Sequence, residues 1–189
     1  MGLRDVLFGK KKLAEPAAER LFALVTAAIT LQTELNLRTG GVGAVCFKPL
    51  SAAEFERAQT DIQQLLEGVA AESASKLERS EDSFGYQWIV VRDAQLEDQV
   101  TAVHAVASGL EEQGFGPQLL AAVFRFDGGK YPVYFIYGYK RGAFWPFVPK
   151  GEAQDRDNAT ELELKAKLEK ELPIEQDLTR WFGVFDAPL

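Results

Sequence analysis

The side chains that most often carry out catalysis are sparse in this sequence of 189 residues, which has one histidine, His104, and one cysteine, Cys46. His104 follows Val103 in a segment with helical spacing, and no G-x-S-x-G elbow is present to offer it a nucleophile. Cys46 lies between Val45 and Phe47 in a predicted strand, where a thiol is usually an inert small hydrophobe. We therefore expect both side chains to have packing roles, and we predict no enzymatic activity.

Motifs that bind a phosphate or a metal ion are also missing from the sequence. The cluster from Gly40 to Gly43 precedes a predicted strand, whereas a dinucleotide-binding loop follows a strand and begins a helix. The acidic pair Glu97 and Asp98 lacks the spacing of a calcium loop and stands at the start of a predicted helix, where negative charge is favourable. We therefore predict no cofactor and no metal site.

One group of residues has the composition of a binding site, because a basic pair joins a run of aromatic residues directly after a predicted hairpin. The group consists of Tyr139, Lys140, Arg141, Phe144, Trp145 and Phe147. Arginine and aromatic side chains are enriched in protein interfaces, where they bury a large area with few rotatable bonds. The aromatic residues could instead line the domain's own core, or Lys140 and Arg141 could clamp a small anionic ligand. We take the group as the predicted partner-binding site and keep these alternatives open.

The first twelve residues form a second candidate surface, in which apolar side chains precede three lysines. Its candidate membrane-contact residues are Leu3, Leu7, Phe8, Lys10, Lys11 and Lys12. A short apolar turn followed by lysines can rest on an anionic membrane surface. The alternative is a solubilising chain terminus. We predict that residues 1–12 form a flexible tail with at most peripheral membrane contact.

Composition disfavours several classes of function. Lysine and arginine number 21 against 28 aspartates and glutamates, a net charge of −7, which disfavours nucleic-acid binding and general adsorption to anionic lipid. No apolar run approaches the roughly 18 residues needed to span a bilayer. A single cysteine excludes an internal disulfide and fits a reducing compartment. We therefore expect a cytoplasmic protein in which residues 13–189 form one domain.

Alternating helical and strand patterns predict an α+β domain. We expect helices over residues 16–25, 51–66, 96–110 and 160–172, strands over 42–48, 76–79, 86–91, 119–126 and 131–139, and loop over 68–75. Residues 27–37 fit either a strand or a helix, and their alternation of apolar and polar residues favours the strand. The predicted fold is an antiparallel sheet built from β-hairpins with helices packed on one face. Apolar residues spaced through 173–185 predict that the C-terminus docks on the core.

Short motifs along nearly the whole chain carry a family resemblance. They include Leu7 to Lys10, Gly41 to Pro49, Phe115 to Leu120, Tyr139 to Gly142, and Arg180 to Phe182. With these motifs the sequence resembles the PspA-associated protein family PspAB. The resemblance implies a cytoplasmic accessory of the phage-shock envelope-stress response, with a PspA-like coiled-coil protein or another envelope-stress component as partner and with no catalytic residues. The order of helices and hairpins is also similar to type III secretion chaperones, which are binding modules.

Overall fold

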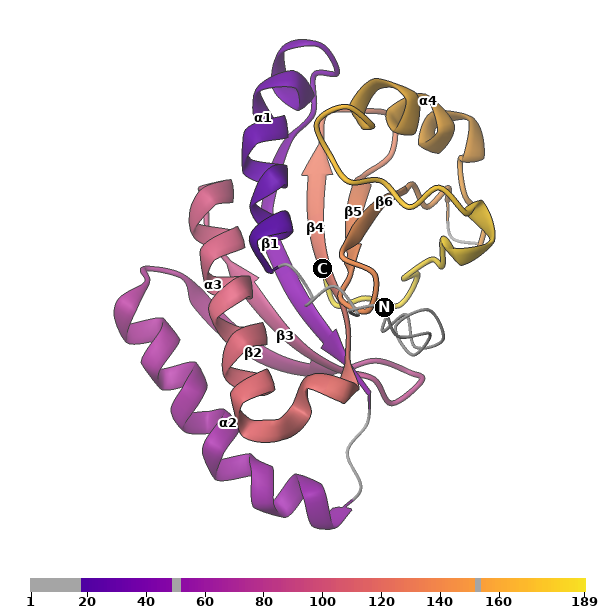
Figure 1. Cartoon of the computed structure of the whole chain (residues 1–189). Coiled ribbons are helices and arrows are strands. Elements are labelled where there is room, and N and C mark those ends of the chain that lie inside the picture. The colour runs from indigo at the N-terminus through magenta and orange to yellow at the C-terminus, as the bar shows by residue number, and fades with distance from the viewer. Residues whose placement is uncertain (1–17, 49–51, 152–153) are drawn as a thin grey trace, which may run out of the picture.

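The centre of the molecule is a six-stranded antiparallel sheet with strand order β2-β3-β1-β4-β5-β6 (Figure 1). The computed structural model describes residues 18–48, 52–151 and 154–189. The strands are β1 (Arg38–Phe47), β2 (Lys76–Glu81), β3 (Gln87–Arg92), β4 (Leu119–Asp127), β5 (Val133–Gly138) and β6 (Ala143–Phe147). The helices are η1 (Ala18–Phe22), α1 (Ala23–Thr33), α2 (Ala52–Glu72), α3 (Leu96–Leu110) and α4 (Asn158–Leu168), together with three shorter turns, η2 (Glu111–Phe115), η3 (Gly116–Gln118) and η4 (Leu178–Arg180). The predicted α+β class and antiparallel hairpins are confirmed.

Three helices lie along one side of the sheet, as predicted, and α4 contacts β6 at the sheet edge (Figure 1). Helix α3 packs on β1, β3 and β4 through a stripe of fully buried residues that includes Val103 and Leu110. Gly43 of β1 permits this contact, because a Cβ at that position would lie 2.9 Å from the Phe124 ring and 3.4 Å from Val103. Helix α2 packs outside α3, and α1 contacts both α3 and β1.

Residues 27–33 form the second half of helix α1, so the predicted strand over residues 27–37 is wrong. Leu24, Ala27 and Leu31 are fully buried at intervals of three and four residues, whereas Ile29 is 71% exposed. The spacing of apolar residues fitted both the two-residue period of a strand and the 3.6-residue period of a helix. The buried residues follow the helical period. The chain then turns through residues 34–37 before β1 begins at Arg38.

The loop predicted for residues 68–75 is also too long, because α2 continues to Glu72. Ile62 and Val69, seven residues apart on one helical face, are both buried, so the apolar stripe outlasts Gly68. Gly68 therefore does not end helix α2. No helix among the described residues is long and apolar enough to cross a membrane.

The aromatic run over residues 143–147 is an edge strand, β6, which the sequence pattern did not indicate. On its outer side the Phe144 N–H donates to the Pro173 carbonyl at 2.8 Å, and the Phe144 carbonyl accepts from the Glu175 N–H at 2.8 Å. Pro146, two residues along, has its nitrogen on the same outer side, where no neighbouring strand needs a donor. An edge position therefore reconciles proline with a strand.

Candidate functional site

The C-terminal segment, residues 173–189, crosses the face of the sheet opposite α1, α2 and α3. Cys46 is on this face because Gly43, three residues earlier in β1, faces α3. The Trp145 and Phe182 rings pack edge to face with centroids 4.6 Å apart, and the Trp145 Nε1–H donates to the Phe182 carbonyl at 3.0 Å. Near the end of the chain, the Ser83 hydroxyl donates to the Asp186 carboxylate at 2.6 Å. The predicted docking of the C-terminus is confirmed.

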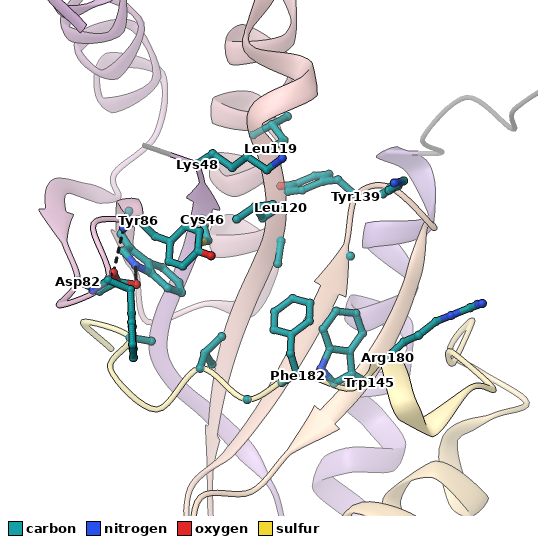
Figure 2. A pocket seen from close by; sticks show the side chains of 18 of the residues that line it. Cys46, Lys48, Asp82, Tyr86, Leu119, Leu120, Tyr139, Trp145, Arg180 and Phe182 are labelled. Carbon is teal, nitrogen blue, oxygen red and sulfur yellow. Dashed lines mark hydrogen bonds between the residues drawn. The ribbon is translucent and has the colours of Figure 1, made fainter. Parts of the chain in front are cut away.

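A cavity of about 890 Å³ lies between this segment and the sheet (Figure 2). We call it the apolar groove. Its floor comes from directly paired positions on neighbouring strands, which antiparallel register places on one face. These positions are Cys46, Trp88, Ala121 and Gly138, joined by Trp145. The C-terminal segment supplies further apolar lining through Phe182, Val184 and Phe185.

Exposed aromatic side chains gather at this groove. Among the described residues, three of the six exposed large apolar side chains line it, namely Phe84, Tyr86 and Phe182. Phe84 is 65% exposed and Phe182 49%. Exposed apolar side chains that are continuous with an apolar cavity mark a binding surface, because covering them removes a large area from water.

One carboxylate holds the aromatic turn between β2 and β3. Asp82 Oδ1 accepts from the N–H groups of Phe84 and Tyr86, at 3.0 and 2.9 Å. Its Oδ2 accepts from Trp88 Nε1 at 2.9 Å, a bond drawn in Figure 2. A single side chain therefore fixes both the exposed rings and part of the groove floor.

The hydroxyl of Tyr139 is an unpaired polar group in the groove wall. Its residue is 7% exposed, and within the described residues the hydroxyl has no hydrogen-bond partner. Burial raises the pKa of Tyr139 far above its ordinary value, with smaller contributions from Tyr137 and Glu111, so this hydroxyl keeps its proton as a donor. The hydroxyl oxygen is itself shielded from solvent, and an unpaired buried hydroxyl is unfavourable.

The charged rim of the groove carries both signs. Arg141 Nε lies 3.5 Å from Glu175 Oε2, and Arg180 Nε lies 2.9 Å from Asp177 Oδ2. Lys48 and Lys140 form no ion pair with any described residue. Figure 2 shows Lys48 at the same end of the groove as Tyr139. The rim therefore carries two ion pairs and two unpaired lysines.

The Cys46 thiol is expected to react very slowly in the folded protein. Burial, followed by the negative charge of Asp82, raises the pKa of Cys46 to about 12. At pH 8 iodoacetamide should label it roughly a thousandfold more slowly than in urea, because thiolate is the reactive form. The shift also predicts that stability falls as the pH rises from about 9 towards 12, since the unfolded chain loses this proton first. Equal labelling rates with and without urea would contradict the burial of this thiol.

The residues predicted to bind a partner are divided between core and groove. Phe144 and Phe147 are fully buried on opposite faces of β6, and Phe147 packs edge to face on Phe185 with ring centroids 4.9 Å apart. Tyr139 and Trp145 are buried but line the groove, and Lys140 and Arg141 stand on its rim. The role of all six residues in binding stays a prediction. The predicted membrane-contact residues, Leu3 to Lys12, lie outside the described residues.

Sequence reasoning missed Phe84, Tyr86 and Phe182 as surface residues. The available signal was the turn from Asp82 to Gly85, which places a phenylalanine where turn residues are usually polar. His104 is not near this groove lining; it packs edge to face on Phe22 at 5.5 Å, with the Ser108 hydroxyl 3.5 Å from its Nδ1. No described residues form a group that could hold a metal ion.

A family model described as PspA associated protein B matches residues 1–189, the whole chain. The chain belongs to the PspAB family. Membership links it to PspA and to the phage-shock stress response. Comparison with curated proteins and with solved structures finds no match. The expected similarity to type III secretion chaperones is therefore not confirmed.

Proposed function

We propose that this protein is a non-catalytic, cytoplasmic accessory of PspA that binds an apolar segment of its PspA-like partner in the apolar groove. Membership of the PspAB family supports the choice of partner. The observation that carries the choice of site is the set of exposed rings around the groove, Phe84, Tyr86 and Phe182. All three of the exposed large aromatic side chains among the described residues line this one cavity.

The chemistry of the groove suits a polypeptide. Apolar side chains of the partner would cover Phe84 and Phe182 and fill the space above Trp145. The unpaired ammonium groups of Lys48 and Lys140 at the rim would then meet carboxylates of an acidic partner.

Replacing Phe84 with alanine tests this proposal. Loss of an exposed aromatic anchor should weaken binding of PspA at least tenfold, about 1.4 kcal/mol, measured by isothermal titration. Ile29→Ala is the matched control, because Ile29 is exposed to a similar degree on α1, away from the groove. Both substitutions are on the surface, so thermal unfolding should change little in either variant. Equal binding by the two variants would remove the groove from the partner site.

A second candidate function is the binding of a small anionic ligand at the same place. It is favoured by the basic pair Lys140 and Arg141 on the rim of a cavity whose volume is typical of small-molecule sites. Titration with inorganic phosphate and with dodecyl phosphate would test it. Binding that is lost in Lys140→Ala would favour this function, and absence of binding to either probe would count against it.

Peripheral membrane contact through residues 1–12 is a separate proposal, motivated by Leu3, Leu7 and Phe8 beside three lysines. Flotation with phosphatidylglycerol vesicles compares the wild-type chain with a Leu7→Asp variant. Retained flotation of the variant would exclude this segment as the anchor.

A further inference from the structure

We propose that residues 3–8 of this chain occupy the apolar groove when no partner is bound, and so compete with the partner for it. The competition between this segment and the partner rests on the proposed function. The occupancy of the groove by residues 3–8 does not. It adds a regulatory contact within the chain to the site described above.

The start of the described chain lies at the rim of the groove. Arg20, in η1, has its Cδ 3.6 Å from the position that a Cβ on Gly142 would take, and Gly142 follows the rim residue Arg141. Seventeen residues precede Ala18. Residues 1–17 therefore join the described chain beside the Arg141 end of the groove.

The connecting residues are long enough for this contact. Ala18 is ten positions after Phe8, and an extended chain spans up to about 3.3–3.6 Å per position, or roughly 35 Å. This reach exceeds the radius of gyration of about 16 Å expected for a domain of this length. Residues 3–8 can thus enter the groove from the side of Arg141 without moving η1.

The composition of the segment matches the groove. Its apolar residues are Leu3, Val6, Leu7 and Phe8. Their side chains would cover the exposed rings of Phe84 and Phe182. Lys10 to Lys12 follow, and Glu111 of the groove lining forms no ion pair with a described residue. Lys48 and Lys140 line the same groove and also lack an ion pair with a described residue, so the apolar residues, and not the lysines, carry this match.

Attachment to the same chain makes even a weak contact effective. A short flexible connection gives an effective concentration of the order of millimolar. A segment that binds with an intrinsic dissociation constant of about 0.1 mM would then occupy the groove in roughly nine molecules of ten. Partner affinity would fall about tenfold as a result.

Photo-crosslinking in the full-length chain tests the occupancy. Phe8 is replaced by the photoreactive residue p-benzoyl-phenylalanine, and the same residue at exposed Thr60 of α2 is the control. We expect irradiation of the first variant to give an intramolecular crosslink to residues 84–88 or 182–187, mapped by mass spectrometry on the monomeric band. Crosslinks outside the groove, or only between two chains, would overturn the proposal.

Binding of PspA to the full-length Leu7→Asp variant tests the competition. A charged side chain should expel the segment from an apolar groove, so the variant should bind PspA about tenfold more tightly than the wild-type chain. Equal or weaker binding by Leu7→Asp would show that the segment does not compete. If PspA fails to bind either chain, the proposed function fails, and the crosslink still decides whether the segment occupies the groove.

Discussion

Replacing Arg156 with alanine is expected to lower the free energy of unfolding by about 3–5 kcal/mol. The Arg156 Nε–H group donates to both oxygens of Glu161, at 2.9 and 3.1 Å, and its Nη1 donates to the Trp181 carbonyl at 2.8 Å. The Glu161 side chain is almost fully buried, and its remaining bond is from the Val148 N–H. The substitution would leave a buried carboxylate without its cation and release the C-terminal segment at Trp181. Urea unfolding measures the loss.

Arg92→Ala is the matched control for that measurement. Arg92 pairs with Glu78 at 3.4 Å, but both side chains are about half exposed, so its loss should cost at most about 1 kcal/mol. A variant with both Arg156→Met and Glu161→Gln should recover much of the stability, because it buries no unpaired charge and still offers an acceptor to Val148. An Arg156→Ala chain no less stable than Arg92→Ala would show that the buried pair contributes little.

Trp145→Ala should lower the free energy of unfolding by about 3–5 kcal/mol, as loss of a large buried ring does. The ring fits across the neighbouring strand because Gly138 has no Cβ there; one would lie 2.9 Å from Trp145 Cζ3. The substitution also removes the partner of the Phe182 ring and carbonyl. The C-terminal segment should therefore detach locally, and trypsin should cleave after Arg180 faster than in the wild-type chain.

Trp145→Phe separates packing from hydrogen bonding. It keeps most of the apolar ring and loses the Nε1 donor to the Phe182 carbonyl, so the expected cost is nearer 1 kcal/mol plus a small cavity term. If cleavage after Arg180 is equally slow in Trp145→Ala and in the wild-type chain, Trp145 does not hold the segment.

The sequence was sufficient for elements whose periodicity has one interpretation. The hairpin of β4 and β5 and the helix α3 were predicted with nearly their observed bounds, because their apolar patterns fit one period each. Around Ile29 two periods coincide, and tertiary burial decides between them. Around Pro146 propensity argues against a strand, and only the strand's place at the edge of the sheet makes proline acceptable there.

The candidate site was less predictable, because it depends on contacts between distant parts of the chain. The aromatic run was correctly singled out, but no local pattern shows that Trp145 lies beneath Phe182 or that Phe144 points into the core. Docking of the C-terminal segment creates the groove. Its lining combines residues from β1 to the end of the chain. A local sequence pattern does not show that residues so far apart in the chain come together.

Asp82 accepts three hydrogen bonds, and these bonds affect how a partner would be recognised. Because that carboxylate already fixes the backbone of Phe84 and Tyr86 and the ring of Trp88, this side of the complex is preorganised. Little conformational entropy would be lost there on association, so more of the contact energy would become affinity. Loosening the turn, as in Asp82→Ala, would weaken binding without deleting any ring that touches the partner.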